Sequence, residues 1–93
     1  MAGMEMLNTV KGILIDHSDL IPGAVKSQFK EKCKISARLR EDLGFDNTSL
    51  IELVVVLEES FGIDIPDDGI TKANTVKELT DMLDKLVKAT GRR

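Results

Sequence analysis

Residues 41–68, EDLGFDNTSLIELVVVLEESFGIDIPDD, decide the fold of this chain. Their apolar side chains recur every three or four residues, which is the spacing of one helix face. Nine acids and no Lys or Arg accompany that face. The stretch therefore predicts an amphipathic helix with a strongly acidic exposed side. The apolar positions are Leu50, Leu53, Val54, Leu57 and Phe61.

The ends of this helix carry recognisable signals. Asp46 or Asn47 can cap its start, because a short side-chain oxygen accepts a hydrogen bond from a free backbone N–H. Gly62 is a usual residue just past a helix end. Gly44 lies in a tight approach to this helix, where a backbone without a Cβ is useful. Residues 63–68 predict a turn, with a short helix or a further turn over 67–71.

The flanking segments predict further helices. Residues 5–16 have an apolar stripe at helical spacing, and a last helix begins at Thr75, which forms a Thr-x-x-Glu capping box with Glu78. Residues 19–40 read either as a long loop or as a short extra helix, and we expect Ile35 and Leu39 to anchor them to the core. We expect residues 1–4 and 89–93 to fray. The pattern predicts an all-α fold, a small four-helix bundle with three longer helices and one short helix.

Composition narrows the function classes. Ninety-three residues suffice for one domain, which we take to span residues 1–93. The net charge is −3, and residues 48–93 carry the whole excess, with six basic and nine acidic side chains. An acidic surface repels nucleic-acid phosphates and favours proteins with basic patches. We therefore expect protein partners and no nucleic acid.

The sequence also indicates a location. Cys33 is the one cysteine, so no intramolecular disulfide can form, which fits a reducing cytoplasm. The start of the chain lacks the basic and apolar segments of a signal peptide. No apolar run approaches the roughly 20 residues that span a bilayer. We expect a cytoplasmic monomer with no membrane span.

Residues with catalytic chemistry are scarce. The single His17 lies at an expected helix end, and no Cys/His cluster has zinc spacing. Asp64, Asp67 and Asp68 lack the alternating ligands and the closing Glu of a calcium loop. No set of nucleophile, base and orienting group can be assembled. The sequence predicts a protein that is not an enzyme, with no catalytic residue and no metal site.

Several spaced motifs in one gapless register resemble the acyl carrier protein family. They are EDLG-x-D at 41–46, EL-x-x-x-LEE-x-F at 52–61, I-x-IPD at 63–67 and TV at 75–76. The resemblance implies a small helical carrier with a 4′-phosphopantetheine arm. In that family the arm is attached to a Ser directly after the Asp that matches Asp46. This chain has Asn47 at that position, and an amide cannot form the phosphodiester.

Three alternatives follow from Asn47. The chain is a carrier-like domain that carries no arm, either as a natural relative or as a Ser-to-Asn variant. Alternatively, it is loaded at a displaced hydroxyl, Ser49 in a shifted Ser-Leu pair or, less simply, Thr48. In the third alternative the fold serves a non-carrier protein-interaction or regulatory adaptor. A peptidyl carrier shares the fold and the arm, although the acidic helix argues against it.

The resemblance also implies a partner surface on the acidic helix. Its acids match positions where carriers present charge to basic surfaces of acyl-processing enzymes, including a phosphopantetheinyl transferase. Its apolar positions match side chains that lie among those charges. The implied pathways are fatty-acid, polyketide or related acyl metabolism. The expected partner-binding residues are Asp46, Glu52, Val55, Val56, Glu58 and Glu59.

Overall fold

The fold consists of helices joined by loops, in a computed structural model that describes residues 4–66 and 69–90. The longer helices are α1 (Met4–Asp16), α3 (Asn47–Phe61) and α5 (Val76–Thr90). The shorter elements are a 3-10 turn, η1 (Ser18–Leu20), and the helices α2 (Lys26–Lys32) and α4 (Gly69–Lys72). No β-strand occurs in these described ranges. Their one β-type contact is an isolated antiparallel bridge between Arg38 and Thr75. The all-α fold class is confirmed.

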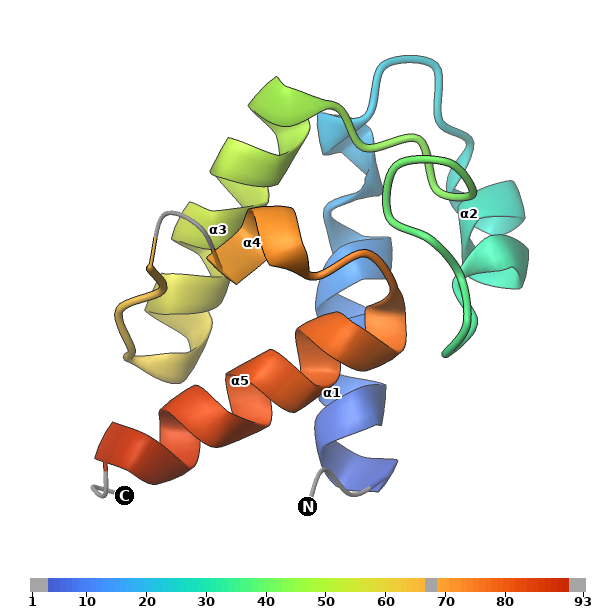
Figure 1. Cartoon of the computed structure of the whole chain (residues 1–93). Helices are drawn as coiled ribbons and strands as arrows, with labels where there is room; N and C mark the ends of the chain where they lie inside the picture. Colours follow the sequence, from blue (N-terminus) through green and yellow to red (C-terminus); the bar gives the residue numbers. More distant parts are fainter. Residues whose placement is uncertain (1–3, 67–68, 91–93) are drawn as a thin grey trace.

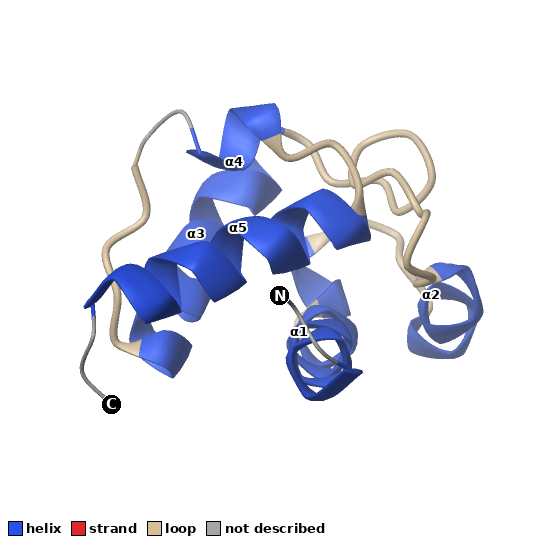
Figure 2. Ribbon diagram, turned by 60° about the horizontal axis from the view of Figure 1, so that its bottom comes forward, coloured by secondary structure: helices blue, strands red, loops and turns tan. Residues whose placement is uncertain are grey.

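The long helices pack around one apolar core. Helix α5 packs against α1, while α3 and α2 lie on opposite sides of α1 (Figure 1, Figure 2). The stripe predicted from the sequence of α3 points inward, because Leu50, Leu53 and Leu57 are buried. Each such side chain stabilises the fold by about 1.5–3 kcal/mol when it is buried instead of exposed. The most deeply buried large side chains are Val10, Leu14, Leu39, Leu53, Leu57, Val76, Leu79 and Leu83.

A short helix occupies part of residues 19–40, which the sequence left open between loop and helix. Helix α2 is held by Phe29 and Cys33, which are both buried and lie four residues apart. The Phe29 ring meets Phe45 edge to face, with ring centroids 6.1 Å apart. Val25, four residues before Phe29, is 51% exposed because it precedes the helix as its N-cap. The contacts of one helical turn therefore anchor the segment.

The loop after α2 docks on the start of α5. The N–H of Val76 donates to the Ala37 carbonyl, and the N–H of Lys77 donates to the Ile35 carbonyl, each at 2.9 Å. These bonds satisfy first-turn N–H groups that a helix cannot pair internally. Leu39 is buried as expected, but the expectation for Ile35 is wrong, because its side chain is 46% exposed. Ile35 holds the loop through its backbone.

The capping box predicted for α5 is present. The Glu78 N–H donates to Thr75 Oγ1 at 3.1 Å, and Glu78 Oε1 accepts from the Thr75 N–H at 3.3 Å. The same Glu78 oxygen accepts from the Asn74 N–H at 2.7 Å. Helix α5 is therefore fixed at its start by its own side chains as well as by the docked loop.

The helical segments extend slightly beyond the expected bounds. The sequence predicts fraying ends over 1–4 and 89–93, and within these ranges the structure describes Met4, Ala89 and Thr90 as helical. An ion pair one turn apart, Lys88 Nζ to Asp84 Oδ2 at 3.0 Å, supports the last turn. Of the turn expected over 67–71, Asp67 and Asp68 lie outside the described residues, and α4 begins at Gly69. Residues 1–3 and 91–93 also lie outside.

Two glycines in different backbone conformations give a matched test of this fold. Gly44 has φ of +90°, and a Cβ there would lie 3.4 Å from Ile21 Cγ2. We expect Gly44→Ala to lower the free energy of unfolding by about 1–2 kcal/mol. Gly12 lies inside α1 in open space, so Gly12→Ala should raise it by about 1 kcal/mol. Urea unfolding of both variants checks this, and a Gly44→Ala protein as stable as the parent would contradict the loop conformation.

Candidate functional site

The first turn of α3 is where the sequence placed the candidate attachment residues. Asp46 is the N-cap, and its Oδ1 accepts from the Ser49 N–H at 2.8 Å. Asn47 is therefore the first helical residue, and its side chain is exposed. Asn47 Oδ1 accepts a hydrogen bond from Arg40 Nη2 at 2.7 Å. Of the two caps that the sequence allowed, Asp46 performs the capping, while Asn47 faces solvent beside an arginine.

Ser49, the alternative attachment residue, is built into the interior. Its side chain is 1% exposed. Its Oγ lies 2.7 Å from Asp46 Oδ1 and 3.2 Å from the Leu20 carbonyl oxygen, and its one hydroxyl hydrogen donates to these acceptors. Thr48, in contrast, is exposed. Ser49 therefore ties the start of α3 to the end of η1 and has no open face toward solvent.

The Asp46 carboxylate is stabilised in its charged form. The hydroxyl and the backbone N–H of Ser49 both donate to it, and they lower the pKa of Asp46 below its usual value. The nearby Arg40 charge acts in the same direction. A carboxylate that accepts two hydrogen bonds favours ionisation because its protonated form loses acceptor capacity. Asp46 is consequently ionised at neutral pH, and its carboxylate caps α3.

The residues of this turn do not fit a phosphodiester-linked arm at position 47. Forming that linkage requires a hydroxyl oxygen that attacks phosphorus. Asn47 offers an amide whose oxygen is already bonded to Arg40. The Ser49 hydroxyl is enclosed, and an approach to it would require opening the first turn of α3. Thr48 is the remaining hydroxyl of the turn, one residue past the matched position.

A ridge of exposed side chains runs from this turn along α3. Asn47, Ile51, Val55 and Glu59 follow one another at four-residue intervals, so they lie along one side of the helix. Ile51 is 65% exposed and Val55 is 50% exposed, although both are aliphatic. Glu52 borders the ridge and is also exposed. We call these five residues the α3 face.

Sequence reasoning found part of this face. Val55 was expected there, whereas Val56, expected with it, is half-buried. Ile51 was missed, although its position four residues before Val55 and off the Leu50–Leu53–Leu57 stripe is a usable signal. An exposed aliphatic pair rimmed by acids is typical of a protein-binding surface.

Glu58 differs from the other acids of α3. The sequence placed it in water, but it is half-buried, and its Oε2 accepts from the Ile65 N–H at 2.8 Å. That bond spans seven residues and holds the loop between α3 and α4. A hydrogen bond to a charged acceptor in a partly buried place contributes about 1.5–3 kcal/mol. Glu58 is therefore a structural acid, whereas Glu52 and Glu59 are exposed.

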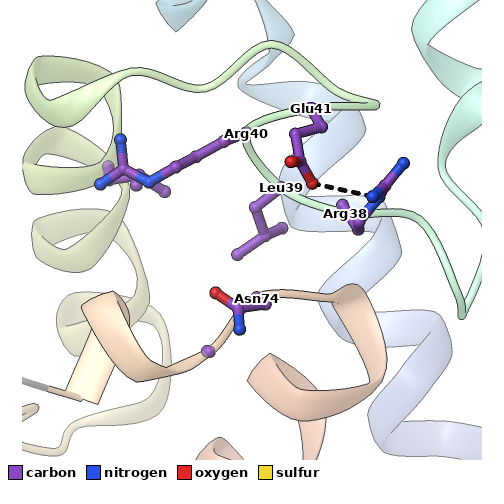
Figure 3. Close-up of a pocket in the computed structure, with 7 residues that line it drawn as sticks. Arg38, Leu39, Arg40, Glu41 and Asn74 are labelled. Carbon is purple, nitrogen blue, oxygen red and sulfur yellow. Dashed lines mark ion pairs between the residues drawn. The ribbon is translucent and has the colours of Figure 1, made fainter.

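A pocket lies beside the first turn of α3, between the loop before α3 and the loop before α5 (Figure 3). Its volume is about 300 Å³, and Leu39, Leu50 and Ala73 contribute apolar atoms to it. Arg40 extends across it toward α3, while Asn74 projects into it from the loop before α5 (Figure 3). This volume is at the lower end of the range for small-molecule pockets.

Other candidate chemical groups lie apart from this site. His17 Nδ1 is 3.0 Å from the Ile13 carbonyl, so the ring closes the end of α1. Cys33 is buried, and its burial raises the pKa of the thiol. Among residues 4–66 and 69–90, no group of three or more His, Cys, Asp or Glu side chains could hold a metal ion. Within the same ranges, no helix is long and apolar enough to cross a membrane.

Comparison with known proteins places the site within a family pattern. A family model described as "Phosphopantetheine attachment site" matches residues 24–83. The chain is 34% identical over 85 residues to an acyl carrier protein of Campylobacter hominis, covering 91% of this chain and 98% of that protein. It is 36% identical to an acyl carrier protein of Zymomonas mobilis, covering 82% and 87%. One from Rhodopseudomonas palustris is 36% identical, covering 91% and 98%.

The Asp46 cap predicts a pH dependence with a definite sign. The folded pKa lies below the unfolded value of about 3.9, so the ionised cap stabilises the fold above that value. The contribution is lost as the pH falls through the lower folded pKa. We expect Asp46→Ala to be less stable than the parent at pH 7, with the difference vanishing in acid. Urea unfolding from pH 7 to pH 2 measures this; a difference that grows in acid would contradict the cap.

Proposed function

Because this chain belongs to the acyl carrier protein family, it is a carrier-type protein of acyl metabolism and not an enzyme, and we propose that it works by docking its α3 face on basic surfaces of acyl-processing enzymes. The family's cofactor is 4′-phosphopantetheine. Within the family, we propose that this chain stays without the arm, because Asn47 stands where the attaching Ser would be. The observation that supports this most is that Asn47 is exposed while the nearby Ser49 hydroxyl is enclosed.

In this proposal, the acids and the aliphatic pair of the α3 face contribute to docking in different ways. Ile51 and Val55 offer apolar area to bury, which supplies contact energy. Glu52 and Glu59 steer a basic partner and set its orientation, and this contribution weakens with added salt. We propose enzymes of fatty-acid, polyketide or related acyl pathways as the partners. We propose that the chain meets them as a monomer in the cytoplasm. An arm-less domain of this kind would occupy the carrier site of such an enzyme without delivering an acyl group.

A loaded carrier with a displaced attachment residue is the alternative. It requires a hydroxyl that reaches the phosphate of coenzyme A. Thr48 is exposed but lies one residue past the matched position, and Ser49 is held by Asp46 and Leu20. An adaptor with no relation to acyl enzymes would use the same α3 face. Binding to a phosphopantetheinyl transferase separates the adaptor from the carrier-like module.

Restoring the hydroxyl should restore loading. We expect Asn47→Ser to gain the mass of one phosphopantetheine arm when incubated with coenzyme A and a broad-specificity transferase. The reason is that residue 47 is exposed at the first helical position, where the α3 face begins. Intact-mass spectrometry with peptide mapping measures the gain. Asn47→Ala is the matched control and should stay unmodified; an unmodified Asn47→Ser beside a converted control carrier would refute the register.

Charge reversal on the α3 face should weaken docking without disturbing the fold. We expect Glu52→Lys with Glu59→Lys to raise the inhibition constant against a phosphopantetheinyl transferase by roughly ten-fold or more at low salt. The assay follows the loading of a second carrier while this chain competes. Glu58 is left intact because it bonds the Ile65 N–H.

The matched control changes the same total charge elsewhere. Glu5→Lys with Glu31→Lys alters two exposed acids on α1 and α2. We expect this control to change the inhibition constant by much less, and helicity to stay the same in both double variants. Equal effects of the two pairs would show that net charge alone, and not the α3 face, attracts the transferase.

A further inference from the structure

A cation, Arg40, lies at one end of the acidic α3 face. Residues 41–68 contain no Lys or Arg, and Arg40 directly precedes them. The loop before α3 brings the Arg40 guanidinium to Asn47, with Nη2 2.7 Å from Asn47 Oδ1. Asn47 starts the ridge that continues to Ile51 and Val55. The charge of Arg40 therefore sits at the N-terminal end of the α3 face.

This positive charge is available to a partner. Arg38 and Arg40 point to opposite sides of their loop (Figure 3). Arg38 is paired, with Nη1 3.1 Å from Glu41 Oε1 and Nε 3.5 Å from Asp42 Oδ2. Arg40, within the part of the chain that the structure describes, donates to a neutral amide and forms no ion pair, although its charge also acts on the nearby Asp46 carboxylate. A guanidinium carries five N–H donors, so most of them remain free for another acceptor.

The surroundings of Arg40 have room for an acidic side chain. The pocket of about 300 Å³ lies directly beside it. Asn74, Leu50 and Glu41 also line this pocket, and the Glu41 carboxylate is paired with Arg38. A carboxylate entering there would meet the guanidinium fork, which matches carboxylate geometry, and the amide of Asn74. A lysine or arginine in the same place would face a like charge, which is unfavourable.

We infer that Arg40 is a specificity-determining residue of the α3 face, which favours protein partners that place an Asp or Glu opposite the first turn of α3 and disfavours partners that are basic there. This inference rests on the proposed docking of α3. It names a mixed partner surface, with basic side chains facing Glu52 and Glu59 and one carboxylate facing Arg40. Enzyme surfaces that are uniformly basic bind this chain less well than they would without Arg40.

The test measures inhibition of a broad-specificity phosphopantetheinyl transferase, whose loading of a second carrier this chain competes with. Arg40→Gln should lower the inhibition constant roughly two- to five-fold, the size of one exposed charge interaction, and Arg40→Glu should lower it further. Arg38→Gln is the matched control with the same charge change two residues away. It should change the inhibition constant less than Arg40→Gln does, since Arg38 points away from α3.

A charge exchange on the transferase tests the preference for a carboxylate. Lysines and arginines around its carrier site are replaced by Glu one at a time. At least one such variant should be inhibited better by the parent chain than by Arg40→Glu, which reverses the order seen with the unaltered transferase. A coupling of this kind reports direct proximity of the two changed residues.

The outcomes separate the inference from the proposed function. Inhibition that depends on Glu52 and Glu59 but is equal for the parent, Arg40→Gln and Arg40→Glu overturns the role of Arg40 alone. Equal gains from Arg40→Gln and Arg38→Gln overturn it too, because net charge then explains both. The absence of a reversed order with every transferase variant overturns the carboxylate preference. A parent chain that does not inhibit at all overturns the proposed docking, and the inference with it.

Discussion

The start of α3 depends on the hydrogen bonds between Asp46 and Ser49. With Asp46 as the cap, the helix begins at Asn47, and every later residue of α3 takes a fixed side of the helix. This phase encloses Ser49, exposes Asn47 and puts Ile51 and Val55 in water while Leu50, Leu53 and Leu57 enter the core. If the sequence were shifted by two residues along α3, each of these side chains would move around the helix by more than half a turn. The enclosure of Ser49, on which the proposed arm-less state rests, thus follows from one cap.

Much of this arrangement could be predicted from the sequence because it depends on local signals. The α3 stripe, Gly62 at its end and the Thr75–Glu78 capping box each involve residues within a few positions of one another. Helix α2 stayed undecided, since Phe29 and Cys33 form a single turn whose burial depends on distant elements. Local patterns specify where helices start and end, and tertiary contacts decide whether a short one forms.

The errors and omissions concern contacts between distant residues. Glu58 looked like a surface acid, because a sequence cannot show that the Ile65 N–H seven residues on needs an acceptor. Ile35 looked like a core residue, yet its side chain is exposed, and its carbonyl accepts a hydrogen bond from the Lys77 N–H at the start of α5. Arg40 gave no helical periodicity that would link it to Asn47. The acids of α3 therefore divide into one that holds the fold and two that face outward, a division visible only in three dimensions.

The most direct measurement is the intact mass of the unaltered chain after incubation with coenzyme A and a broad-specificity phosphopantetheinyl transferase, beside a control carrier that is fully converted. With α3 starting at Asn47 and Ser49 enclosed, the mass stays unchanged. An adduct mapped to Ser49 would contradict the cap and the start of the helix, because the hydroxyl would have to leave Asp46. An adduct mapped to Thr48 would contradict the arm-less state and make this protein a working carrier.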